Sequence, residues 1–133
     1  MTKRDQLIAR LAVEAEPQVV PIAEFLDGND DLASIGCNLL EHPGMDTFRE
    51  VFRRVSARAD VEAVYAQIAE LDPGEESWPF ADTVWVVGTI PVPDLTAILE
   101  PLDPDEVGFA PPADVPAGLT GRHKTPILLV WWD

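Results

Sequence analysis

The stretch "TVWVVGTI", residues 83–90, has the pattern that most strongly decides the fold. β-Branched and aromatic residues dominate it, which is typical of a β-strand. Alternation places apolar residues on both of its faces: Val84, Val86 and Ile90 on one, Trp85 and Val87 on the other. The closing stretch "PILLVWW", residues 126–132, has the same property. A sheet built from such strands must be covered on both faces.

Helical and extended patterns follow one another along the rest of the chain. Apolar residues at three-to-four spacing predict helices over 4–15 and 44–58, with shorter helices over 21–28 and 91–102. The stretch "ASIGCNLL", 33–40, is predicted as a strand, and 60–71 is interpreted as a strand although a helix also fits. After the first helical part the order is β-α-β-β-α-β. We therefore expect an α+β fold with a ferredoxin-like antiparallel sheet and an N-terminal helical extension.

The length of 133 residues suits a single domain over 1–133. Within it we expect a helical extension over 1–28 and an α+β core over 33–133, interrupted by a proline-rich loop over 101–125. The last strand, 126–132, would lie at an edge of the sheet and carries none of the charges that normally protect edges. We expect a second copy of the protein to cover it in a homodimer, with the N-terminal helix as the competing cover.

The charge is strongly negative and unevenly distributed. Nine basic and twenty-four acidic side chains give a net charge of −15, and residues 70–114 carry eleven acids and no base. Such a field repels nucleic acids and anionic membranes and speeds encounter with basic partners, although solubility alone would also explain it. The chain has no apolar run of membrane-spanning length, no signal-like leader and one cysteine, so a cytoplasmic location is expected.

The stretch "DGNDDLASIGCN", 27–38, invites comparison with a calcium loop. Asp27, Asn29 and Asp31 fall at the first, third and fifth positions of an EF-hand. The glycine required at the sixth position is Leu32, and the bidentate acid required at the twelfth is Asn38. The pattern therefore predicts a turn and no metal site.

No catalytic residue and no cofactor are predicted. Alternation in the expected strand 33–40 buries Cys37 among aliphatic side chains, where a thiol is inert. His42 lies at the start of a helix, where a neutral structural imidazole is expected. His42 and His123 share no ligand spacing.

Two groups of residues are candidate binding surfaces. The first group suits a basic partner because it combines aromatic rings with an acidic loop, and the alternative is that the rings anchor the loop to the core. Its members are Glu75, Glu76, Trp78, Phe80 and Asp82. The second leaves room for a small ligand on the sheet: Ser34, Asn38, Trp85 and Thr89.

Three stretches resemble a family of small, acidic, uncharacterised bacterial proteins: "EFLDGNDDLASIGCNL" at 24–39, "HPG" at 42–44 and "WPFADTVWVV" at 78–87. The resemblance implies a bacterial origin and carries over no activity or functional residue. From the residues themselves we expect a non-enzymatic interaction protein of the inhibitor, immunity or adaptor kind that binds a basic partner. A small-molecule-binding module is the alternative, and an enzyme of unrecognised chemistry is the third hypothesis.

Overall fold

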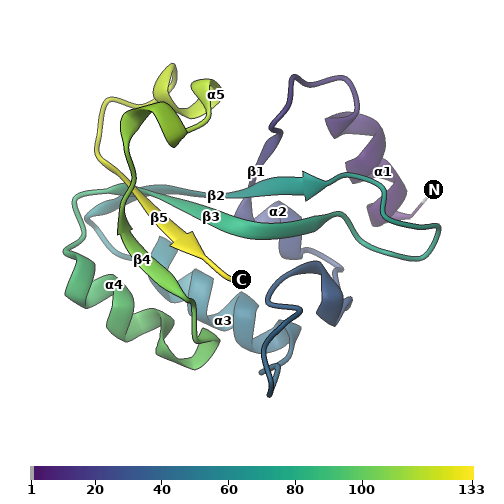
Figure 1. The fold of residues 1–133 in the computed structure, drawn as a ribbon, viewed down its shortest axis with the longest axis horizontal. Coiled ribbons are helices and arrows are strands. Elements are labelled where there is room, and N and C mark those ends of the chain that lie inside the picture. Colours follow the sequence, from purple (N-terminus) through teal and green to yellow (C-terminus); the bar gives the residue numbers. More distant parts are fainter. Residues whose placement is uncertain (1) are drawn as a thin grey trace.

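The computed structural model describes residues 2–133 and shows an antiparallel sheet with helices packed against it (Figure 1). Its five strands are β1 (Val19–Pro21), β2 (Val61–Glu70), β3 (Phe80–Gly88), β4 (Glu106–Phe109) and β5 (Ile127–Trp131). Their order across the sheet is β1-β2-β3-β5-β4. The helices are α1 (Lys3–Leu11), α2 (Ile22–Leu26), α3 (Met45–Ser56), α4 (Val92–Leu99) and α5 (Ala117–Thr120). Three 3-10 turns add Leu32–Ser34, Glu100–Leu102 and Pro112–Asp114.

The mixed α+β class is confirmed, and so are its longest elements. The apolar stripe predicted for 44–58 is the buried face of α3: Met45, Phe48, Val51, Phe52 and Val55. The ambiguous segment 60–71 is strand β2, paired with β3 so that Tyr65 lies opposite Trp85. Gly88 permits the close approach of the two strands, because a Cβ there would lie 2.2 Å from the Asp60 carbonyl oxygen.

The strand predicted over 33–40 is wrong. Residues 32–34 form a 3-10 turn whose start is capped by Asp31, and Gly36 has a φ of 66°, a left-handed conformation that ends any extended run. The run is apolar, but local hydrogen bonds and one glycine turn decide its shape. The first strand of the expected β-α-β-β-α-β order is therefore absent, and the ferredoxin-like topology is not confirmed.

The loss of this strand also changes the position of Cys37. Ile35 is fully buried, as alternation predicts, but the thiol of Cys37 is exposed. The predicted buried cysteine is wrong because side chains in a turn do not alternate between two faces.

The two faces of the sheet are covered by different parts of the chain. The main core contains Val84, Val86, Leu128 and Val130 from the sheet, together with Leu7 and Leu11 of α1 and the buried faces of α2, α3 and α4. On the other face, Tyr65, Trp85 and Val87 pack with Leu119 of α5. The cover expected from α1 or from a second copy is thus supplied by the proline-rich segment, seen as α5 above the sheet in Figure 1.

The prediction that the C-terminal strand is an edge is also wrong. β5 lies between β3 and β4, and β4 comes from within the segment that the sequence predicted to be a loop, 101–125. Trp132 is buried, and its indole N–H donates to the Leu102 carbonyl at 2.8 Å. The reason for expecting a homodimer through 126–132, an uncovered apolar edge, is therefore absent.

Candidate functional site

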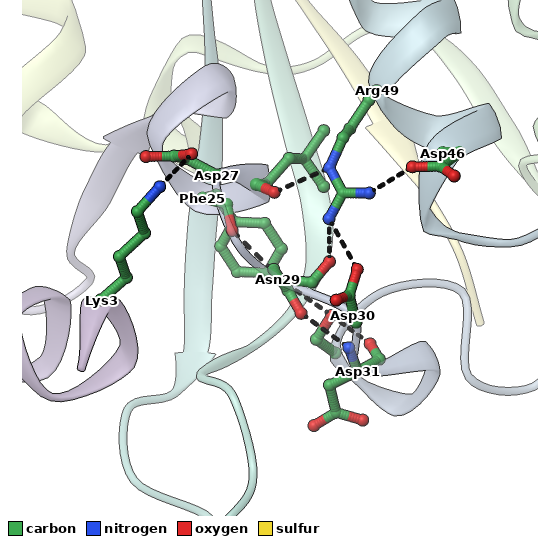
Figure 2. A network of polar contacts seen from close by, with 10 residues as sticks. Lys3, Phe25, Asp27, Asn29, Asp30, Asp31, Asp46 and Arg49 are labelled. Atoms are coloured by element: carbon green, nitrogen blue, oxygen red, sulfur yellow. Dashed lines mark hydrogen bonds and ion pairs between the residues drawn. The ribbon is translucent and has the colours of Figure 1, made fainter.

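The Asp-rich loop, residues 27–31, is held together by its own polar groups (Figure 2). Asn29 is fully buried, and its amide nitrogen donates to the Phe25 carbonyl at 3.3 Å and to the Ser34 hydroxyl at 2.9 Å. Its amide oxygen accepts from the backbone N–H of Asp31 at 3.0 Å. Both polar atoms of the Asn29 side chain therefore have partners in the loop or in the residues next to it, as a buried amide requires.

Arg49 of α3 ties the same loop to the helices. Its guanidinium donates to two backbone carbonyls, that of Leu26 at 3.0 Å and that of Asn29, and it pairs with the carboxylates of Asp30 at 3.1 Å and Asp46 at 2.6 Å. Figure 2 shows these contacts converging on one guanidinium. One guanidinium thus binds two carbonyls and two carboxylates, and it fastens the loop to α2 and α3.

Asp31 connects the loop to the β2–β3 connection. Its second carboxylate oxygen accepts from the backbone N–H of Trp78 at 3.0 Å. Arg4 of α1 holds the other part of this connection, donating to the Ser77 carbonyl at 2.7 Å and to the Gly74 carbonyl and pairing with Asp72 at 2.8 Å. Two of the stretches that carry the family resemblance thus meet at Trp78.

His42 fastens the turn that leads into α3. Its Nδ1 accepts from the Gly44 backbone N–H at 3.0 Å, so Nε2 carries the proton and donates to the Ile35 carbonyl at 2.9 Å. Both ring nitrogens are engaged with backbone, which is a structural role.

A second acidic region lies beside the C-terminal residues and has a different character. A hollow of about 530 Å³ is bordered by four acidic residues: Glu41, Asp103, Asp105 and Asp133. We call it the acidic hollow. None of these four side chains forms an ion pair within residues 2–133, and no basic residue borders the hollow.

The walls of the acidic hollow are held by backbone contacts. Asp105 accepts from the Asp133 backbone N–H at 2.6 Å, and Asn38 donates to the Asp133 carbonyl at 3.0 Å. Trp132 provides a buried apolar wall, while the neighbouring Leu40 projects fully into solvent. The region therefore combines uncompensated negative charge with one exposed aliphatic side chain.

The five residues predicted to meet a basic partner do not form one exposed surface. Glu75 and Glu76 are exposed, Trp78 is only 7% exposed, and Phe80 and Asp82 are half-buried. The ring of Trp78 belongs to the main core, which corresponds to the loop-anchoring alternative.

The four residues predicted to border a ligand are dispersed. Ser34 is buried in the loop network, and Asn38 borders the acidic hollow. Trp85 lies in the cluster on the other face of the sheet, with its indole N–H donated to Gln67 at 2.9 Å, and Thr89 is exposed beyond the end of β3.

Sequence reasoning missed a chain of contacts that includes the second histidine. The Tyr65 hydroxyl oxygen and His123 Nε2 are 2.9 Å apart, and His123 Nδ1 lies 3.4 Å from the Glu62 carboxylate. Glu62 and Tyr65 are on β2 and His123 follows α5, so only the tertiary structure brings them together. The contacts fasten the cover of the second sheet face to β2.

Within residues 2–133, no group of three or more histidine, cysteine, aspartate or glutamate side chains is arranged to hold a metal ion. None of the helices in that range is long and apolar enough to cross a membrane.

Comparison with protein-family models matches residues 2–123 to the uncharacterized protein YfbO family. The chain belongs to this family. The match includes the Asp-rich loop, the β2–β3 connection and most of the cover of the second sheet face. No curated protein and no solved structure gives a significant match.

Proposed function

We propose that the protein is a non-enzymatic interaction protein whose acidic hollow receives a basic segment of a partner. The observation that carries the proposal is the set of four acidic residues around one hollow, with no basic residue beside them. In the Asp-rich loop, by contrast, Asp27 pairs with Lys3 and Asp30 with Arg49. Negative charge without a partner in the chain suits a partner outside it.

Electrostatics and apolar contact would act at different stages of binding. The uncompensated field raises the encounter rate with a basic surface, and its reach is about 10 Å at 0.1 M salt. Once docked, a lysine or arginine side chain would replace water between carboxylates such as Asp103 and Glu41. The exposed Leu40 beside the hollow would add an apolar contact at its border.

The acidic hollow supports this role better than the loop carrying Glu75 and Glu76. That loop was expected to add two aromatic contacts, but Trp78 is packed into the core and Phe80 is half-buried. An inhibitor, an immunity-type protein and an adaptor all fit an acidic docking site, and the chemistry of the captured partner would distinguish them.

The test compares two variants that each remove two negative charges. Glu41→Gln/Asp103→Asn changes the hollow, and asparagine suits position 103 because the residue has a φ of 46°, a left-handed conformation that asparagine tolerates. Glu75→Gln/Glu76→Gln is the matched control on the exposed loop. Each variant and the unchanged chain would be used to capture partners from the native host.

The expected result is a basic protein captured by the unchanged chain and the loop control but lost or strongly reduced with the hollow variant. Its association rate should fall as salt increases, because screening weakens the steering field. Equal capture by all three chains, or an association rate indifferent to salt, would reject the acidic hollow as the docking site.

A small cationic ligand in the same hollow is the second candidate, favoured by the position of Asn38. Its side chain lies at the border of the hollow and is exposed, whereas Ser34 is buried elsewhere. Calorimetry with small amines would test this function directly. Heat of binding that the hollow variant loses and the loop control keeps would support a ligand over a protein partner.

A further inference from the structure

The strand β4 forms a free edge of the sheet. It pairs with β5 on one side, and in the described residues 2–133 no strand lies beyond it on the other (Figure 1). Within the same range, no backbone hydrogen bond joins residues 106–109 to an element other than β5. An edge of this kind presents N–H and C=O groups with which another extended chain can pair.

Hydrogen bonds at the end of β5 show which of its peptide groups face β4. The Asp105 N–H donates to the Trp131 carbonyl at 2.9 Å, so the peptide groups of Trp131 face β4. The N–H of Trp132 donates to the Asp82 carbonyl of β3 at 2.9 Å, so that residue faces the other way. Because the direction alternates along a strand, the groups of Leu129 also face β4.

The register of the pair then identifies the unpaired groups of β4. Glu106 and Gly108 lie opposite the two β5 residues that face β4, so their N–H and C=O groups bond to β5. Val107 and Phe109 alternate with them and direct their N–H and C=O groups away from the sheet. These outward groups have the spacing that a further strand requires.

The opposite edge of the sheet, β1, is less suited to pairing. It is three residues long, its last residue Pro21 has no N–H, and Val20 is fully buried. β4 contains no proline, and a Cβ at Gly108 would meet no atom within 4 Å, so space is open beside the strand. The accessible edge is therefore β4.

The two ends of β4 offer different side-chain chemistry. Phe109 is 73% exposed and is the one aromatic ring among the exposed large apolar side chains of residues 2–133. The other end continues the acidic run that includes Asp103, Asp105 and Glu106, of which the first two border the acidic hollow. In an extended strand, Glu106 and Phe109 are roughly 10 Å apart. An exposed ring and the acidic hollow thus lie at opposite ends of one free edge.

The charge decides between a second copy of the chain and a different partner. Twofold pairing of β4 with β4 of another copy would bring Glu106 and the acids of both hollows together, between two chains that each have a net charge of −15. Charged residues at an edge normally oppose such self-pairing. The same charges favour a basic chain and select against acidic ones.

We propose that β4 accepts an extended basic segment of another protein as an additional antiparallel strand. The N–H and C=O groups of Val107 and Phe109 bond to the backbone of the segment. An apolar residue of the segment lies against the Phe109 ring, and lysines or arginines that follow it toward the C-terminus reach Glu106 and the acidic hollow. This inference rests on the function proposed above and adds how the basic segment is held.

The test is a titration of the ¹⁵N-labelled full chain, followed through backbone amide signals and hydrogen exchange. The probe is an acetylated and amidated peptide of about nine residues, a usual strand length. It alternates valine with threonine in its N-terminal part and lysine with threonine in its C-terminal part. We expect saturable shifts along β4 and slower exchange at the N–H groups of Val107 and Phe109. Exchange at Gly108, which is already bonded to β5, should change less.

Two modified peptides separate strand addition from electrostatic attraction alone. Each has N-methyl groups on every second amide, one on the odd and one on the even set, so the charge is the same in both. One set faces β4 and should weaken binding about tenfold or more, as the loss of hydrogen bonds requires. The other set faces away and should bind nearly as well as the unmodified peptide.

Two variants of Phe109 test the same bonds from the side of the protein. Phe109→Pro removes an outward N–H and keeps the bonds of β4 to β5, which an edge strand tolerates. Phe109→Thr removes the ring alone and is the matched control. The proline variant should bind the peptide about fivefold or more weakly than the threonine variant. If Phe109→Pro lowers the stability of the fold, the methylated peptides test these bonds on the unchanged chain.

Three results would overturn the added strand. The first is the absence of a saturable shift at millimolar peptide. The second is equal binding of both methylated peptides with shifts confined to the acidic hollow, which would leave the hollow as a docking site without strand addition. The third is slow exchange at Val107 and Phe109 that increases with protein concentration in the absence of peptide, which would assign the edge to a second copy.

The hollow variant separates this inference from the function on which it rests. Glu41→Gln/Asp103→Asn should still show slower exchange at Val107 and Phe109 with the peptide, at a lower affinity. Slower exchange at an unchanged affinity would support the added strand and reject the role of the hollow.

Discussion

The Asp-rich loop and the acidic hollow are both rich in carboxylates, but the chain treats their charge in opposite ways. In the loop, Asp30 is paired with Arg49, Asp27 with Lys3, and Asp31 accepts hydrogen bonds from backbone N–H groups. In the hollow, the four acids have no basic residue beside them. The difference teaches that acidic composition alone does not indicate a binding surface. Asp27 and Asp30 pair with bases inside the chain and help to hold the loop, whereas the four acids of the hollow form no such ion pair within residues 2–133.

The largest expected effect is on the loop. Asn29→Ala removes a buried amide that makes three hydrogen bonds and leaves the Phe25 carbonyl and the Asp31 N–H without partners. We expect a loss of about 3 kcal/mol in the free energy of unfolding, measured by urea denaturation. A loss below about 0.5 kcal/mol would show that the loop is not a structural element.

A smaller effect is expected for the arginine that compensates the loop. Arg49→Met keeps an unbranched apolar stem but removes contacts to two carbonyls and two carboxylates, so a loss of about 1–2 kcal/mol is expected. Arg53→Met, one turn along α3, removes a single exposed pair with Glu50 and should cost about 0.5 kcal/mol or less. Equal losses in the two variants would contradict the special role assigned to Arg49.

Removing charge from the acidic hollow should not lower the free energy of unfolding, in contrast to the changes in the loop. Glu41→Gln/Asp103→Asn relieves repulsion among acids that have no basic neighbour, so the unfolding free energy should stay within about 0.5 kcal/mol or rise slightly. The gain should shrink as salt is added, because screening already weakens the repulsion. Denaturation at low and high salt measures both effects. A large loss of stability would mean that these acids are structural, as those of the loop are.

The smallest effect concerns a compensated acid away from both regions. The guanidinium of Arg58 donates hydrogen bonds to Asp60 and lowers the pKa of that carboxyl below its usual 3.8. A lowered folded-state pKa stabilises the protein above the unfolded-state value, and that contribution is lost as pH falls through the folded-state pKa. Asp60→Asn should therefore reduce stability slightly at neutral pH. Below about pH 4, the stability of the variant should fall less steeply with pH than that of the unchanged chain. Thermal unfolding from pH 7 to pH 2 would detect this, and parallel curves for the two chains would contradict it.

The parts of the fold that the sequence predicted well depend on periodic burial. The stripe of α3 and the two apolar faces of β3 and β5 repeat over enough residues to determine their own conformation. The failures occurred at short segments. "ASIGCNLL" is apolar enough for a strand, but the cap of Asp31 and the left-handed Gly36 turn it, and this exposes Cys37. β4 is four residues long and was not recognised within the proline-rich segment.

The candidate sites were predicted less well than the fold, because each depends on residues distant in sequence. Glu75 and Glu76 are exposed as a charged loop suggests, but the burial of Trp78 follows from Asp31 and Arg4. Asn38 borders a hollow only because residues 101–105 and the chain's last residues lie against it. The contacts of His123 with Tyr65 and Glu62 have no local signature at all.

The sequence by itself determined an acidic α+β chain with two-sided strands and one strongly amphipathic helix, because hydrophobic periodicity and net charge are local or additive properties. Only the tertiary structure decided which acids are paired and which segment covers the second sheet face. These properties depend on pairs of groups separated by tens of residues, such as Asp31 with Trp78. Their energies arise only when folding removes both partners from water and brings them into contact.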